Sequence, residues 1–169
     1  MIFLVRLNNQ NGVFMKLYVM RHGMAASADI DPKRGLTQNG SHDIAMMARR
    51  LQNCDNSITQ IIHSGILRAQ ETAEIMAKVL NVPKVIASPE LLAEHGSIDA
   101  IVALSKTWRE NTLLVGHLPM LFQLINKILI NQVDHEPIVD FQPGSIVCLD
   151  HFAPQRFMIE WFISPDVMR

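Results

Sequence analysis

The chain has 169 residues, of which 49% are hydrophobic and 18% are charged, and its formal net charge is −1. This length and composition suit one globular domain with a sizeable core and argue against intrinsic disorder. The near balance of charge gives no support to a broad nucleic-acid-binding or membrane-binding surface, so any bound anion must be held by a few local cations.

The chain carries no pattern typical of export or of a membrane span. No apolar run approaches the roughly 18 residues that a membrane helix needs. The run Met1–Val5 is interrupted by Arg6 and is shorter than a secretory core of about 7–15 apolar residues. Cys54 and Cys148 form no CxxC motif, so we expect two reduced thiols, although one disulfide is compatible with the sequence. We therefore expect a cytoplasmic protein.

Residues 1–15 are expected to be an N-terminal extension of a single domain that spans residues 16–169. The polar cluster Asn8–Gly12 is typical of a turn, and Met15 stands directly before the first predicted strand. We interpret Met15 as the natural start and the preceding residues as an artefact of the translation start. The alternative is a short additional strand over residues 1–6.

After residue 16 the apolar pattern predicts strands that alternate with helices. Strands are predicted over residues 17–20, 57–63, 85–86 and 112–115. Helices are predicted from Thr37 to about Leu51, from Ser64 to about Leu80, after Ser97, and over Pro119–Asn131. Residues 145–152 and 156–163 form a hairpin-like pair joined at Ala153-Pro154. This order predicts an α/β sandwich with a largely parallel sheet.

The first predicted strand ends in two side chains that suit phosphate chemistry. Leu17–Met20 is a continuous apolar run, typical of a buried strand, and Arg21, His22 and Gly23 follow it. In open α/β sheets this end of a strand is where ligands bind. A neutral His22 can attack phosphorus, and Arg21 disfavours a second charge while offering a planar fork of donors to phosphate oxygens. Gly23 lets the chain turn and lets a ligand approach the backbone.

Two more strand ends carry side chains of the same kind. Ser64 and Arg68 follow the second predicted strand, and His117 follows the fourth. Because the carboxyl ends of parallel strands share one edge of the sheet, we expect these side chains to converge with Arg21 and His22. Ser64 and the N–H groups of the same turn would help to bind an anion there.

Each of these side chains also has a purely structural interpretation. Arg68 could pair with Glu71 or Glu74 on its own helix, and His117 could be a hydrogen-bonded core histidine. The end of the first strand could simply be solvated. Their joint placement at element ends favours a site.

Four stretches of the chain together form a specific pattern. They are Val19–Gly23, Leu36–Gly40, His63–Ala73 and Leu114–Pro119. In this order they resemble the motifs of the histidine phosphatase superfamily, also called the phosphoglycerate-mutase-like family. The compact length and the closing Trp161–Pro165 stretch are similar to the short bacterial phosphohistidine phosphatases of the SixA type. The resemblance implies a three-layer α/β/α sandwich of the phosphoglycerate-mutase-like fold.

The resemblance implies roles for four residues. His22 would be the nucleophile and would form a phosphohistidine intermediate, while Arg21, Arg68 and His117 would hold the transferring phosphoryl group. It implies no metal ion or other cofactor, and the seven histidines show no HExxH spacing. The expected partner is a phosphorylated histidine-phosphotransfer protein, with no nucleic acid and no membrane, and we expect a monomer.

The match to the family weakens at the general acid. Many relatives carry a carboxylate in the loop that here runs from Pro89 to Gly96, which makes Glu94 the first candidate and Glu90 the second. Both could instead be solvated loop charges. The imidazole leaving group of a phosphohistidine needs less proton donation than an alkoxide. A weak or absent acid would therefore fit a phosphohistidine better than a sugar phosphate.

We predict a phosphohistidine phosphatase because little chain separates Val85 from Thr112. Relatives that bind small phosphoesters usually carry insertions that close over the substrate, whereas an open pocket suits a histidine displayed on another protein. The alternatives are a small-molecule phosphomonoesterase of the same family and a non-catalytic phosphate-binding module. The intact site residues argue against the second alternative.

A chain that begins at Met15 should match the full chain in thermal midpoint and in phosphatase activity. If residues 1–14 formed a structural strand, their removal would cost about 1 kcal/mol or more and lower the midpoint by about 2–4 °C or more in a domain of this size. Calorimetry of the two chains distinguishes the two cases.

Overall fold

The computed structural model describes residues 15–54, 57–92, 97–105, 108–153 and 156–168. Residues 1–14 of the predicted N-terminal extension, and Pro154 of the predicted turn, lie outside these ranges. The described strands are β1 (Leu17–Arg21), β2 (Gln60–His63), β3 (Lys84–Ala87), β4 (Thr112–Gly116), β5 (Ile146–Ala153) and β6 (Arg156–Ile163). The described α-helices are α1 (Gln38–Cys54), α2 (Leu67–Leu80), α3 (Ile98–Ser105) and α4 (Met120–Ile130).

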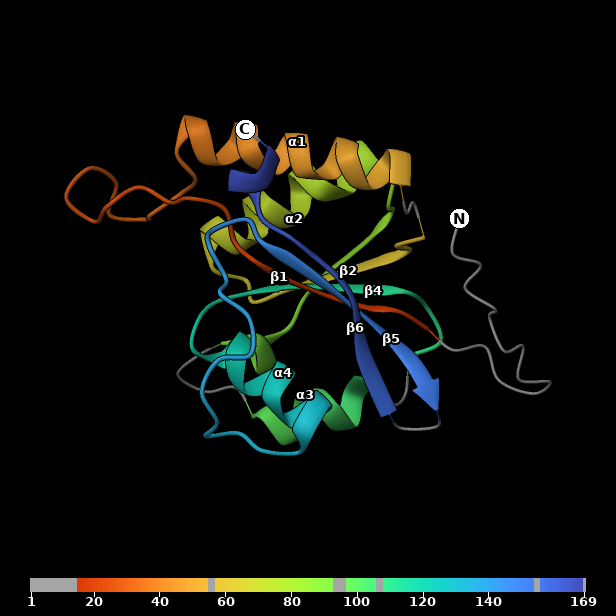
Figure 1. Ribbon diagram of the computed structural model, residues 1–169. Coiled ribbons are helices and arrows are strands. Elements are labelled where there is room, and N and C mark those ends of the chain that lie inside the picture. The colour runs from red at the N-terminus through yellow and green to blue at the C-terminus, as the bar shows by residue number, and fades with distance from the viewer. Residues whose placement is uncertain (1–14, 55–56, 93–96, 106–107, 154–155, 169) are drawn as a thin grey trace.

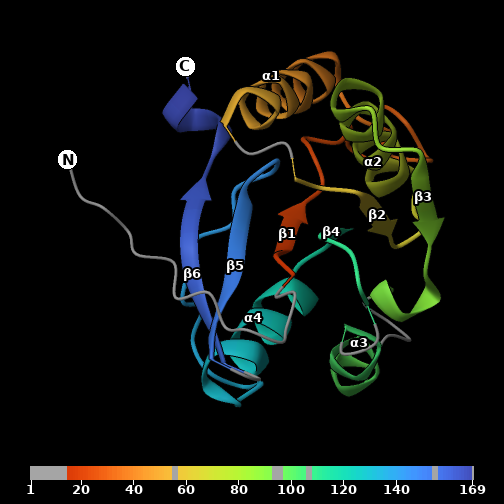
Figure 2. The ribbon, with the colours of Figure 1, turned by 90° about the vertical axis from the view of Figure 1, so that its right-hand side faces the viewer.

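The strands form one sheet in the order β3-β2-β4-β1-β5-β6. The pairs β2–β3, β2–β4 and β1–β4 are parallel, whereas β5 is antiparallel to both β1 and β6. Figure 2 shows β5 and β6 as the long closing pair on one side of β1. The predicted largely parallel sheet with a closing hairpin is confirmed.

The helices make the two outer layers of a three-layer α/β/α sandwich, as predicted. Figure 1 shows α1 and α2 over one face of the sheet and α3 and α4 over the other. Along β1, Tyr18 and Met20 belong to the core beneath α1 and α2, and Leu17 and Val19 to the core beneath α3 and α4. Because both faces of β1 are covered, its sequence is continuously apolar instead of alternating.

Two predicted helix caps are confirmed, and one helix start is corrected. The Thr37 hydroxyl accepts the Gly40 N–H at 2.9 Å, and the Ser97 hydroxyl accepts the Ala100 N–H at 3.2 Å. We predicted that the second long helix starts at Ser64, but α2 begins at Leu67. The intervening residues form a turn in which Gly65 has φ +83°, a conformation that ends the strand and delays the helix.

No helix in the described ranges is long and apolar enough to cross a membrane. Cys54 is exposed and Cys148 is buried, and the two form no disulfide. The expectation of two thiols is confirmed. The Cys148 thiol donates to a Glu160 carboxylate oxygen at 3.3 Å.

The backbone of the loop after β1 lies directly against the first turn of α1. A Cβ atom at Gly40 would lie 2.1 Å from the Met24 carbonyl oxygen, so only glycine fits this contact. The same carbonyl accepts the Thr37 N–H at 2.9 Å. The contact therefore fixes the loop that leaves the end of β1.

We expect Gly40→Ala to destabilise the fold by about 1–3 kcal/mol, because the added methyl group would force the Met24 backbone away from α1. The matched control is Asn39→Ala, at an exposed position of the same helix turn, which should stay within about 0.5 kcal/mol of the wild type. Urea unfolding measures both variants. Similar stabilities for the two would contradict the close approach.

Candidate active site

Three neighbouring strand ends bring the predicted site residues together. Arg21 of β1 pairs with Gly116 of β4, and His63 of β2 pairs with Val115 of β4. The ladder continues one step further, since the His22 N–H donates to the Gly116 carbonyl at 3.1 Å and the Ser64 N–H to the Val115 carbonyl at 3.3 Å. The convergence expected from the sequence is thus observed for these strand ends.

His22 is held as a neutral ring with defined roles for its two nitrogens. Its Nδ1 lies 2.7 Å from the Gly23 carbonyl oxygen, and its Nε2 lies 3.1 Å from the donating Nε–H of Arg68. Nδ1 therefore carries the proton and Nε2 the lone pair. Burial lowers the pKa of His22 to about 4, with the positive charges of Arg68 and Arg21 adding to the effect. The ring is thus uncharged near neutral pH.

The main cause of the lowered His22 pKa is not the one that we expected from the sequence. We expected the neighbouring Arg21 to keep His22 neutral, but burial is the largest cause and Arg68 precedes Arg21 among the charges. His22 is only 9% exposed. The desolvation of a charged ring explains the difference, because it acts wherever the side chain is taken out of water.

His117 lies beside His22, with 4.9 Å between the ring centroids. Its Nε2 shares a hydrogen bond of 2.7 Å with the Ser64 hydroxyl, while its buried Nδ1 has no hydrogen-bond partner among the described residues. Burial, followed by the charges of its neighbours, lowers the pKa of His117 to about 3. We predicted that Ser64 belongs to the site, and its hydroxyl makes a specific contact there that orients His117.

Arg68 makes none of the helix ion pairs considered as alternatives. Its Nε–H is directed to His22, while Glu71 accepts the Leu36 N–H at 2.6 Å and Glu74 accepts from Gln70 at 2.8 Å. Burial lowers the pKa of Arg68, and the charge of Arg34 lowers it further. Its guanidinium is therefore available to an anion at the His22 ring.

Arg21 is anchored at one end of its fork. Its Nη1 donates to the Phe141 carbonyl at 2.6 Å, and its buried Nε has no partner among the described residues. Burial lowers the pKa of Arg21 and the nearby Asp140 opposes that shift. The anchored planar group suits a phosphate oxygen.

Thr72 is a positioning residue to which the sequence analysis gave no role. Its hydroxyl donates to the Arg68 carbonyl at 2.7 Å and accepts the Gly23 N–H at 3.1 Å, so it joins α2 to the end of β1. The signal in the sequence is its spacing of four residues from Arg68 on a helix.

We expected Gly23 to let a ligand approach the backbone, but the structure shows that a glycine is needed there for close packing. A Cβ atom there would lie 2.8 Å from the Ile44 side chain and 3.1 Å from that of Leu36. Apolar side chains already fill the space beside its Cα. The glycine is needed for this close approach of α1 and of the loop before it.

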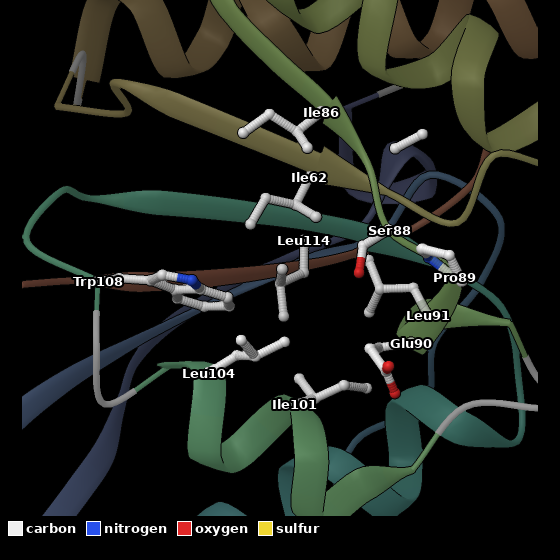
Figure 3. Close-up of a pocket in the computed structure, with 11 residues that line it drawn as sticks. Ile62, Ile86, Ser88, Pro89, Glu90, Leu91, Ile101, Leu104, Trp108 and Leu114 are labelled. Carbon is white, nitrogen blue, oxygen red and sulfur yellow. The ribbon is translucent and has the colours of Figure 1, made fainter.

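Within the part of the chain that the structure describes, Glu90 makes no hydrogen bond or ion pair with His22 or His117. Glu90 lines an apolar cavity of about 220 Å³ with Ile62, Ile101 and Leu114, and Figure 3 shows it among those side chains. Among the described residues, it is not one of the charged groups that act on the pKa of His22 or His117. Glu94, the first candidate for the general acid, lies outside the described residues.

Comparison with known proteins agrees with this arrangement. Residues 17–97 match the histidine phosphatase superfamily (branch 1). The phosphohistidine phosphatase SixA of Escherichia coli is 30% identical over 159 residues, which cover 89% of this chain and 94% of that protein. The chain belongs to the histidine phosphatase superfamily.

Solved structures of this superfamily share the fold. The structure of the protein histidine phosphatase SixA complexed with tungstate is similar with a TM-score of 0.79 and 27% identity, covering 92% of this chain and all of that one. A mycobacterial glucosyl-3-phosphoglycerate phosphatase has a TM-score of 0.68 at 15% identity, covering 88% of this chain and 98% of its own. That second likeness concerns the fold alone. The family match and the SixA relatives support a hydrolase of the phosphatase class.

The two buried histidines should make the stability of the fold depend on pH. In the folded protein their pKa values are lowered to about 4 and about 3, whereas an unfolded histidine titrates near about 6.5. Between these values the unfolded chain binds more protons, so stability should fall as the pH falls from about 6.5 toward 4. We expect His117→Gln to reduce this fall, measured as the free energy of unfolding in urea at each pH. Equal pH dependence in the wild type and the variant would contradict the lowered pKa of His117.

Proposed function

We propose that this protein is a phosphohistidine phosphatase that removes the phosphoryl group from a histidine-phosphotransfer domain or a similar phosphoprotein. The observation that carries the proposal is the neutral His22 ring, whose Nε2 lone pair faces the Arg68 guanidinium. A nucleophile toward phosphorus needs that lone pair, and the adjacent cations suit the charge of a transferring phosphoryl group.

The chemistry would proceed in two displacements. Nε2 of His22 attacks the phosphorus, the new N–P bond forms, and the bond to the substrate nitrogen breaks with its electron pair leaving on the substrate imidazole. Water then attacks the phosphorus of phosphorylated His22 and releases inorganic phosphate, which restores the lone pair. Arg68 would transfer its hydrogen bond from the ring to a phosphoryl oxygen, and Arg21 would neutralise the equatorial oxygens.

His117 would act beside this centre as the second histidine of the phosphoryl site. Its ring lies next to that of His22 and is oriented by the Ser64 hydroxyl. The leaving imidazole asks for little proton donation, so the proposal does not depend on a strong acid. Glu94 remains our candidate for that role.

The relatives and the connection before β4 support the choice of substrate. SixA of Escherichia coli is named a phosphohistidine phosphatase. Between β3 and β4, the described residues contain only the 3-10 helix Pro89–Leu91 and the eight-residue helix α3. A short connection of this kind favours an open site that a protein surface can reach. We further propose that the protein acts in the cytoplasm, which suits its two thiols, and as a monomer.

The competing function is that of a small-molecule phosphomonoesterase of the same superfamily. A glucosyl-3-phosphoglycerate phosphatase has the same fold, so the fold is compatible with a small phosphoester substrate. An alkoxide leaving group would need a general acid, worth about 10²–10⁴-fold in rate. The two functions therefore differ in their demand on the loop that carries Glu94.

The proposal is tested by comparing a phosphorylated histidine-phosphotransfer domain with p-nitrophenyl phosphate, each with and without EDTA. We expect a higher kcat/KM on the phosphoprotein and no effect of EDTA. His22→Ala should lose at least about 10⁴-fold in turnover and retain a cooperative unfolding transition. His42→Ala, at an exposed position of α1, is the matched control and should keep full activity. Preferred turnover of p-nitrophenyl phosphate would move the assignment to the phosphomonoesterase.

A further inference from the structure

The loop between β1 and α1 is fastened to the helix that carries Arg68. Ala25 and Leu36 form an antiparallel bridge at the base of the loop. The Leu36 N–H donates to Glu71, which stands three residues after Arg68 on α2. The loop is therefore held in a defined place beside the phosphoryl site.

Arg34 lies in this loop, and local hydrogen bonds hold its backbone in an unusual conformation. Its φ is 52°, in the left-handed region that a non-glycine residue rarely adopts. The Arg34 N–H donates to the Asp31 carbonyl at 2.8 Å, and the two Asp31 carboxylate oxygens accept the Lys33 and Gly35 N–H groups at 3.0 and 2.7 Å. The Asp31 carboxylate is thus occupied by backbone N–H groups and does not pair with the Arg34 guanidinium.

The Arg34 guanidinium is exposed and only lightly tethered. Its Nε donates to the Ala26 carbonyl at a long 3.4 Å, and among the described residues its terminal nitrogens have no hydrogen-bond partner and no carboxylate in ion-pair range. A cation left unpaired in a fixed loop is available to an external anion.

The charge of Arg34 acts on two groups of the phosphoryl site, His22 and Arg68. After burial, and after the charges of Arg68 and Arg21, its charge contributes to the lowered pKa of His22, and it is the charge that lowers the pKa of Arg68. The described contacts of the His22 ring are with Gly23, Arg68 and His117, and Arg34 is not among them. The geometry of the loop agrees, because Leu36, two residues after Arg34, donates its N–H to Glu71, which lies one turn after Arg68 on α2.

The same loop exposes two large apolar side chains. Met24, which directly follows Gly23, is 48% exposed, and Ile30 at the far end of the loop is 81% exposed. Large exposed apolar side chains on the loop that leaves a phosphoryl site are typical of a surface that contacts another protein. A protein surface around a phosphorylated side chain would cover both.

We propose that Met24, Ile30 and Arg34 form a docking surface for the protein that carries the phosphoryl group, with Arg34 contacting a carboxylate beside the phosphorylated residue and the two apolar side chains contacting its apolar neighbours. This inference rests on the proposed function, because it assumes that the phosphoryl group arrives on a protein. Arg34 binds the carrier and takes no part in the displacement at phosphorus.

The test compares Arg34→Gln with Lys33→Gln on two substrates. Lys33 is an adjacent exposed cation whose charge does not appear among the causes of the His22 and Arg68 pKa shifts, so it controls for net charge. On a phosphorylated histidine-phosphotransfer domain at low ionic strength, Arg34→Gln should lower kcat/KM about threefold to tenfold and flatten its salt dependence, mainly through KM. On p-nitrophenyl phosphate it should stay within about twofold of the wild type, as should Lys33→Gln on both substrates. Ile30→Ser should follow the pattern of Arg34→Gln without the change in salt dependence.

Other outcomes would overturn the docking surface. Equal losses on both substrates would make Arg34 part of the phosphoryl site, no loss on either would leave it without a role, and an equal effect of Lys33→Gln would reduce the result to net charge. Binding of the phosphoprotein to the His22→Ala protein, with and without Arg34→Gln, separates docking from turnover. Unchanged affinity there overturns the docking surface, whereas weakened affinity together with a wild type that does not hydrolyse the phosphoprotein supports docking and overturns the proposed function.

Discussion

The burial of an uncharged imidazole against a guanidinium is the constraint on which the site depends. Nε2 of His22 can accept the Arg68 N–H only while the ring is neutral, and Nδ1 is committed to the Gly23 carbonyl. Among the described residues, Asp140 is the one carboxylate that shifts the pKa of any of the four central groups, and it acts on Arg21 alone. The native fold thus holds two arginines beside two uncharged histidines, an arrangement that suits a dianionic phosphoryl group.

The sequence alone predicts the sheet and the position of the site well, because both follow from short-range pattern. A strand buried on both faces must be apolar throughout, as Leu17–Met20 is, and parallel strands must end at one edge. These two rules place His22, Arg68 and His117 together without any knowledge of distances. Thr37 and Ser97 cap helices for an equally local reason, since a side-chain hydroxyl meets an N–H three residues away.

The features that the sequence does not reveal depend on contacts between distant segments. Gly23 resembles a ligand-facing glycine, but the space beside it belongs to Ile44, a neighbour that becomes visible only once α1 packs. Burial lowers the pKa of His22 more than any neighbouring charge does, and this burial likewise exists only once the helices cover the sheet. Thr72 has no special feature in the sequence, and its role depends on the hydrogen bond that its hydroxyl accepts from the Gly23 N–H in the folded protein. For Arg34 the sequence leaves open whether the side chain reaches the mouth of the pocket or lies on the surface, because its left-handed backbone depends on the hydrogen bonds of the folded loop.

The strand that leads into His22, β1, is the first of the described sheet to be synthesised, yet its neighbours β4 and β5 both come from the second half of the chain. On the ribosome, this apolar segment waits for most of the protein to emerge before it can be paired on both sides. It must be shielded from aggregation during that interval. The same order means that an interrupted translation product carries His22 without the strands that position it, so the site can assemble only after most of the chain has been made.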